Sequence, residues 1–159
     1  MPPVIRAMQP QDKEAVLELI RSTTEFKAIE IEVAGELVEA YHHSGRESGY
    51  HVLVAQDDSS IAGYICYGPT PLTEGAWDVY WIAVSGSSRR QGVARKLLSA
   101  AEDSIRKANG RLLLIETSSL PQNESARHLY RSQGYRMVAT ILDFYAPNDD
   151  KIIFQKRLR

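Results

Sequence analysis

The 159-residue sequence contains a single cysteine, Cys66. One cysteine cannot form an intramolecular disulfide, which excludes a disulfide-stabilised secreted scaffold. Cys66 lies in the alternating run IAGYICYG, so we expect it to be a small residue in the core or the sheet. No run reaches the ~18 apolar residues of a membrane span, and the N-terminus lacks the basic and apolar regions of a secretory signal. We therefore expect a cytoplasmic protein with no membrane partner.

Long blocks of one charge sign are also missing. The chain has 19 Lys and Arg against 20 Asp and Glu, for a formal net charge of −1. Nucleic-acid binders neutralise phosphates with a clustered basic excess, so this balance argues against a nucleic-acid partner. Basic residues do gather in the segment 89–96. The four histidines show no H-x-x-x-H or H-E-x-x-H spacing, and we expect no metal site.

Hydrophobic periodicity predicts one α/β domain over residues 1–159, with a mixed, mostly antiparallel sheet flanked by helices. The loop PTPLTEG (69–75) cannot continue a strand because of its prolines and glycine. Alternating or β-branched runs predict strands at 4–8, 51–56, 61–68, 77–84, 112–117, 135–146 and 151–158. Apolar residues at helical spacing predict helices from about Asp12 to Ile20, over 31–43, for about four turns from Val93, and over 123–133.

The centre of the chain predicts a βαβ unit. The strand 77–84, the helix from Val93 and the strand 112–117 follow in that order, so the two strands should pair in parallel with a right-handed crossover. The near-continuous apolar run RLLLIETSS suggests that the second strand is covered on both faces. On the helix, Glu102 with Arg106 and Asp103 with Lys107 should form i,i+4 pairs on the polar face.

The stretch SGSSRRQGVARKLL joins the first of these strands to the helix and is a candidate anion site. A helix N-terminus presents unpaired N–H groups and a favourable dipole to an anion. Gly92 allows close approach of a ligand and a positive φ, and Ala94 keeps the first turn thin. Positive charge comes from Arg89, Arg90, Arg95 and Lys96. A solvated basic turn is the alternative. The P-loop and the G-x-G-x-x-G fingerprint are both absent, which argues against ATP hydrolysis and nicotinamide chemistry.

Two motifs carry a resemblance to a known family. RRQGVA (89–94) resembles the [QR]-x-x-G-x-[GA] pyrophosphate loop of the GNAT superfamily, the acyl-CoA-dependent N-acetyltransferases. NESARHLYRSQGY (123–135) matches that family's N-x-x-A-x-x-L-Y-x-x-x-G-[FY] segment. The resemblance implies a GNAT fold with a splayed parallel strand pair. It also implies transfer of an acetyl group from acetyl-CoA to a primary amine, by direct attack in a ternary complex. A non-catalytic acyl-CoA sensor or scaffold of the same fold is the alternative.

The resemblance also implies which residues bind coenzyme A. Unpaired backbone groups at the end of the strand would bind the pantetheine arm, and backbone amides of the loop would hold the pyrophosphate, reinforced by two arginines. Asn123 matches an asparagine that contacts the cofactor arm, although the inserted SSLPQ before it departs from the commonest family pattern. The implied cofactor-binding set is Ile82, Ala83, Val84, Arg89, Arg90, Gln91, Gly92, Val93, Ala94, Arg95 and Asn123.

Three residues are candidates for proton transfer. Tyr130 matches the family tyrosine that protonates the departing CoA thiolate; without the resemblance, core packing beside Leu129 would be the favoured interpretation. Glu116 and Asp78 match positions where different family members carry a general base. Glu116 could instead be the partner of a basic side chain, Asp78 could be an exposed strand end, and water could relay the proton.

The acceptor is not specified by any motif. The resemblance bounds its site by the first two helices, the 69–75 loop and the C-terminal hairpin, where PNDD and Asp143 add acidic side chains. We expect a small-molecule or peptide amine as partner, and a homodimer stays open.

Overall fold

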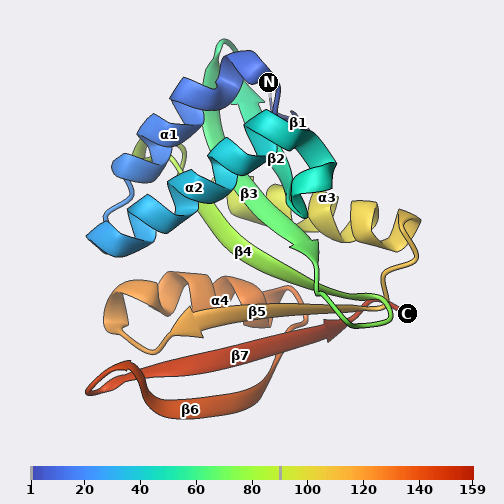
Figure 1. Cartoon of the computed structure of the whole chain (residues 1–159). Helices are drawn as coiled ribbons and strands as arrows, with labels where there is room; N and C mark the ends of the chain where they lie inside the picture. Colours follow the sequence, from blue (N-terminus) through green and yellow to red (C-terminus); the bar gives the residue numbers. More distant parts are fainter. Residues whose placement is uncertain (1, 90) are drawn as a thin grey trace.

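The computed structural model describes residues 2–89 and 91–159. Its core is a seven-stranded sheet with the order β1-β2-β3-β4-β5-β7-β6 (Figure 1). Within the described residues, β4 and β5 form the one parallel pair, and the other neighbours are antiparallel. The strands are β1 (Val4–Ala7), β2 (His51–Asp57), β3 (Ser60–Pro69), β4 (Ala76–Val84), β5 (Leu112–Ser118), β6 (Arg136–Ala146) and β7 (Asp149–Arg157). The predicted mixed, mostly antiparallel α/β fold is confirmed.

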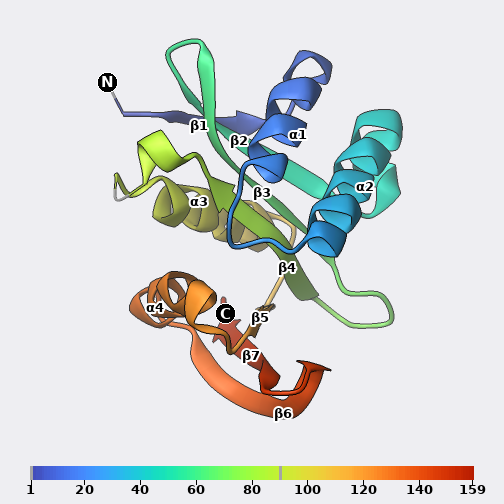
Figure 2. The same cartoon turned by 90° about the vertical axis from the view of Figure 1, so that its left-hand side faces the viewer.

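Helices cover both faces of this sheet. They are α1 (Lys13–Arg21), α2 (Ala28–Ser44), α3 (Val93–Lys107) and α4 (Glu124–Ser132), with short 3₁₀ turns at Pro10–Asp12, Gly45–Ser48, Gly86–Ser88 and Pro121–Asn123. Figure 2 shows α3 and α4 on one face and α1 and α2 on the other. The α3 side buries Leu97, Leu98, Ile105, Leu113 and Phe154 completely, and the α1–α2 side buries Val16, Val38, Val54 and Tyr64. Burial of each large aliphatic side chain contributes about 1.5–3 kcal/mol.

The helix α2 starts earlier than the predicted residue 31. Its first residue is Ala28, and the Glu30 carboxylate accepts a hydrogen bond from the backbone N–H of Lys27 at 2.9 Å. A carboxylate that satisfies an N-terminal amide stabilises the first turn of a helix. This cap from Glu30 extends the helix beyond its apolar pattern.

The prediction that the strand 112–117 is covered on both faces is wrong. In β5, Leu113, Ile115 and Thr117 are buried, whereas Leu114 is half-buried and Glu116 is exposed. The helices α1 and α2 lie over the strands up to β4 and leave the corresponding face of β5 open (Figure 1). The apolar run therefore predicts more burial on the Glu116 side of β5 than the structure shows.

Glu102 does not lie on the polar face of α3 as predicted. Its side chain is buried and accepts hydrogen bonds from the Tyr135 hydroxyl at 2.7 Å and from Lys156 Nζ at 2.8 Å. The predicted i,i+4 pair with Arg106 does form, at 3.7 Å, although Arg106 lies closer to Asp103, at 3.1 Å. Local spacing could not reveal partners that lie 33 and 54 residues further along the chain. The network joins α3 to the C-terminal strands.

Replacing Tyr64 with phenylalanine should raise the free energy of unfolding by about 1 kcal/mol. The Tyr64 side chain is fully buried on β3, and its hydroxyl has no hydrogen-bond partner among the described residues. Burying an unsatisfied polar group costs about 1–3 kcal/mol, and phenylalanine removes it without leaving a large cavity. Urea denaturation measures the change.

Tyr135→Phe is the matched control for Tyr64→Phe. It deletes a buried hydroxyl that does have a partner, the Glu102 carboxylate at 2.7 Å, so it should lower the free energy of unfolding. A loss of stability in Tyr64→Phe would contradict the assignment of Tyr64 as unsatisfied.

Candidate active site

The parallel strands β4 and β5 separate soon after they pair. Their register runs from Ala76 opposite Leu112 to Val79 opposite Ile115, after which β4 continues to Val84 and β5 to Ser118 without pairing to each other. Figure 1 shows the two strands as the arms of a V that opens away from this short pairing. The facing edges 80–84 and 116–118 thus have backbone donors and acceptors without strand partners across the gap. An extended ligand with amide groups can pair with such an edge.

A bulge marks the start of the gap on β4. The pairing of β3 with β4 jumps from Tyr67 opposite Val79 to Cys66 opposite Trp81, which leaves Tyr80 as the extra residue. A β-bulge bends its strand and increases the local twist, and bulges are frequent next to active sites. The bulge therefore helps to turn the arm of β4 away from β5.

The arm of β4 leads directly to the N-terminus of α3. Gly92 precedes this helix with a φ of +75°, and Lys96 N–H donates the first helical bond to the Gly92 carbonyl at 3.1 Å. The N–H groups from Gly92 to Arg95 consequently have no helical acceptor. No atom of the described residues lies within 4 Å of a Cβ built on Gly92, so the space beside this residue at the helix start is open. The donor set and the open approach fit a pyrophosphate group.

The side chains of the predicted loop make contacts within the protein, unlike the backbone amides at the helix start. Arg89 forms a two-pronged ion pair with Glu25, with Nη2 at 2.7 Å from Oε2. The Arg89 guanidinium holds the pKa of the Glu25 carboxyl below its usual value. The side-chain amide of Gln91 donates a hydrogen bond to the Ser87 carbonyl at 3.3 Å. Val93, the first residue of α3, has its side chain buried in the core. The predicted contribution of Arg90 lies outside the described residues.

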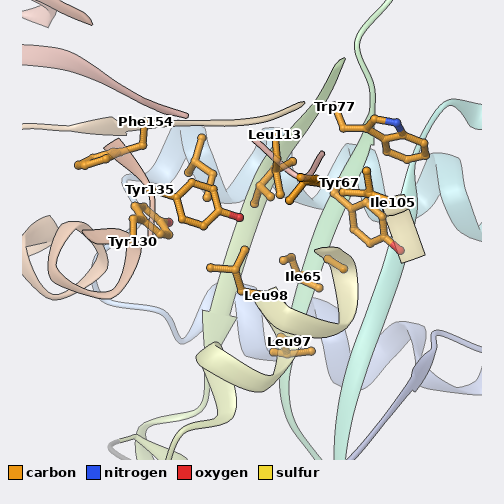
Figure 3. Packing of buried hydrophobic residues seen from close by; sticks show 14 of the residues in the cluster. Ile65, Tyr67, Trp77, Leu97, Leu98, Ile105, Leu113, Tyr130, Tyr135 and Phe154 are labelled. Carbon is orange, nitrogen blue, oxygen red and sulfur yellow. The ribbon is translucent and has the colours of Figure 1, made fainter. Parts of the chain in front are cut away.

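Tyr130 is the most buried of the predicted catalytic side chains, with 4% of its surface exposed. Its ring lies 5.6 Å from that of Phe154 and 6.2 Å from that of Tyr135 (Figure 3). Burial raises the pKa of the Tyr130 phenol above its ordinary value of 10. The residue is thus part of the core and is also held in the protonated form at neutral pH, as a proton donor must be.

The two candidate bases lie on the open face of the sheet. Asp78 is opposite Leu114 in the paired section, and Glu116 is the first residue of β5 beyond it. Their sequence neighbours on both strands pack into the core beneath α3, so strand alternation places both carboxylates on the α1–α2 side. Asp78 accepts a hydrogen bond from Thr70 Oγ1 at 2.5 Å. Glu116 is half-exposed, with Oε2 at 3.0 Å from Lys151 Nζ.

Tyr80 stands close to both candidate bases, although it was not among the predicted residues. Burial is the largest cause that raises its pKa, to about 12, and the negative charges of Asp78 and Glu116 add to it. Tyr80 follows Asp78 by two residues on β4, and Glu116 is the first β5 residue past the pairing, so all three lie near the point where the strands begin to diverge. The sequence WDVYWIAV predicts the strand but carries no signal for the bulge that sets Tyr80 apart.

Asn123 lies at the start of α4, where the inserted SSLPQ ends in a 3₁₀ turn. Its backbone N–H donates to the Leu120 carbonyl at 3.0 Å, and its side chain makes no capping bond to the helix. The insertion thus leads into α4, and the side-chain amide of Asn123 does not cap this helix.

Within residues 2–89 and 91–159, no three His, Cys, Asp or Glu side chains converge in a way that could hold a metal ion. In the same part of the chain, no helix is long and apolar enough to cross a membrane.

Comparison with known proteins identifies the family. Residues 48–137 match the model of the acetyltransferase (GNAT) domain. A protein from Desulfovibrio desulfuricans assigned to the GNAT family has a structure with a TM-score of 0.94 and 39% identity, over 99% of both chains. The sequence matches none of the curated proteins with which it was compared.

More distant structures share the fold. YncA of Salmonella typhimurium, an acetyltransferase by description, was solved with its cofactor acetyl-CoA; it has a TM-score of 0.78 and 20% identity over 100% of this chain and 95% of the other. The ribosomal-protein-S18-alanine N-acetyltransferase of Escherichia coli has a TM-score of 0.77 and 20% identity over 98% and 94%. The family model and the 39% identical relative show that the chain belongs to the GNAT superfamily of acetyltransferases.

Proposed function

We propose that residues 1–159 act as one catalytic domain that transfers an acetyl group from acetyl-CoA to a primary amine. One observation carries the proposal: the unpaired arm of β4 runs straight into the open N-terminus of α3. A ligand with amide groups and a pyrophosphate, as coenzyme A has, finds matching partners along that path. The Salmonella protein, solved with acetyl-CoA, and the Escherichia coli protein, named for an alanine of a ribosomal protein as acceptor, support the same function.

The cofactor-binding residues of this proposal follow the path of the chain. The free edge at Ile82–Val84 would pair with the pantetheine arm, and the amides from Gln91 to Arg95 would hold the pyrophosphate. Arg89, Arg90 and Asn123 complete the set by the match to the family motifs.

Proton transfers at the vertex of the V complete the reaction. Acetyl-CoA supplies an acyl group activated as a thioester. An alkylammonium has a pKa of ~10.4 and must lose a proton before its nitrogen can attack the carbonyl carbon. Glu116 is the base we propose, because it lies beyond the last β4–β5 pair at the edge of the gap, whereas Asp78 lies inside the paired section. As the carbon–sulfur bond breaks, the Tyr130 hydroxyl gives its proton to the sulfur.

Calorimetric titration with coenzyme A tests the cofactor site. Gly92→Ala should weaken binding about fivefold or more, because a φ of +75° costs an L-residue roughly 1–2 kcal/mol and the new methyl enters the open approach. Gly86→Ala is the matched control in the same loop: Gly86 has open space around its Cβ position but no positive φ, so its affinity should equal that of the wild type.

Two outcomes would contradict this site. Absence of heat at millimolar coenzyme A in the wild type would exclude the cofactor itself. Equal affinities of Gly92→Ala and the wild type would place the binding elsewhere on the protein.

A further inference from the structure

Three consecutive residues between α1 and α2 contact three different elements around the gap. Glu25 pairs with Arg89, the Phe26 ring meets the Trp81 ring edge-on at 5.2 Å, and Lys27 Nζ lies 2.8 Å from Asp149 Oδ2. We call residues 25–27 the strap. Because each of the three residues contacts a different side chain, the path of the strap between the two helices is fixed at three points.

The strap crosses the open end of the V. Trp81 lies on β4 beyond the last β4–β5 pair, and Arg89 lies in the loop before α3. On the other arm, Asp149 is the first residue of β7, almost fully buried, and it accepts a hydrogen bond from Ser118 at the end of β5. Figure 2 shows the connection between α1 and α2 descending along β4. The strap therefore ties the β4 arm to the β5–β7 arm on the α1–α2 face.

Glu25 engages the side chain that the proposed pyrophosphate site requires. Both terminal nitrogens of Arg89 point to the two carboxylate oxygens of Glu25, the same forked geometry in which arginine binds phosphate. Arg89 is nonetheless 46% exposed, so an anion can reach it. A phosphate at the start of α3 would meet a guanidinium that is already shared with a carboxylate, and that carboxylate also repels the phosphate.

We propose that Glu25 competes with the phosphates of the cofactor for Arg89, so that cofactor binding releases the Glu25 end of the strap and loosens the cover over the acceptor face. Glu25 acts through Arg89 and is a positioning residue, not a catalytic one. This inference rests on the proposed function, since it takes the anion in the loop to be that of coenzyme A.

The size of the effect follows from the exposure of the pair. Partly exposed ion pairs are weak, and a competitor of that strength changes a dissociation constant by about two- to fivefold. Glu25→Gln keeps the shape of the side chain and removes its charge, so coenzyme A should bind about two- to fivefold more tightly. Glu18→Gln is the matched control, because Glu18 is an exposed residue of α1 whose partner is Arg21, at 3.1 Å. The affinity of this variant for coenzyme A should equal that of the wild type.

Trp81 emission supplies a second measurement that does not depend on turnover. The chain has two tryptophans, so Trp81→Phe identifies the part of the signal that comes from Trp81. Coenzyme A should change the Trp81 emission of the wild type as Phe26 moves, and unliganded Glu25→Gln should already be shifted toward the liganded spectrum.

The outcomes separate this inference from the proposed function. Equal or weaker coenzyme A binding by Glu25→Gln, or an unliganded emission spectrum identical to that of Glu18→Gln, would overturn the competition while leaving the cofactor site intact. Failure of the wild type to bind coenzyme A would overturn the cofactor site, and the unliganded spectra would still decide whether Glu25 holds the strap.

Discussion

Tyr130→Phe should lower kcat by about 10²-fold or more, with little change in the KM for acetyl-CoA. Burial raises the pKa of the Tyr130 phenol, so the hydroxyl is protonated at neutral pH and is available to donate to the sulfur as the carbon–sulfur bond breaks. Phenylalanine retains the ring that packs on Phe154 and Tyr135 and removes only the hydroxyl group. Steady-state kinetics over a range of acetyl-CoA concentrations separates the two constants.

Tyr64→Phe is the control for the Tyr130 experiment. It removes a hydroxyl from another fully buried tyrosine, on the α1–α2 side of the sheet, and should leave kcat unchanged. An unchanged kcat in Tyr130→Phe as well would return Tyr130 to a purely structural role in the core.

Glu116→Gln should lower kcat/KM at neutral pH by about 10²-fold, and the loss should shrink as the pH rises. Without a base, only amine that has already lost its proton can react, and that fraction grows tenfold per pH unit until it nears the amine pKa of ~10.4. The pH profile of the variant should therefore climb toward that of the wild type at alkaline pH. A loss due to misfolding would show no such recovery.

Asp78→Asn distinguishes the competing base. It keeps the hydrogen bond from Thr70 possible and removes the charge, so its activity should stay within a few-fold of the wild type if Glu116 is the base. A large loss in Asp78→Asn with an active Glu116→Gln would reverse the assignment. Two active variants would point to water as the proton acceptor.

The sequence predicts much of this architecture because the local signals agree with one another. The strand 77–84, the helix from Val93 and the strand 112–117 each have a distinct period, and all three elements lie within two residues of their predicted bounds. The anion loop was also recognisable, because Gly92 and the surrounding charges mark the helix start. Its backbone geometry, with a positive φ at Gly92, agrees with that expectation.

The features that shape the gap were not predictable from local patterns. Nothing in LLLIET indicates that pairing stops at Ile115, since the alternation of buried and less buried residues continues through Thr117. The Glu25–Arg89 pair joins residues 64 positions apart. The sequence pattern predicts a solvent-exposed Glu102 because its partners, Tyr135 and Lys156, come from the far end of the chain. Long-range charge pairs leave no trace in hydrophobic periodicity.

Release of free thiol from acetyl-CoA, measured against a panel of primary amines with mass analysis of the products, tests the central claim most directly. We expect the wild-type protein to release one thiol for each acetylated amine, and only when an amine is present. Tyr130→Phe should nearly abolish this thiol release. Tight binding of coenzyme A without amine-dependent thiol release across peptide, polyamine and amino-sugar acceptors would contradict the enzyme and favour an acyl-CoA sensor of the same fold.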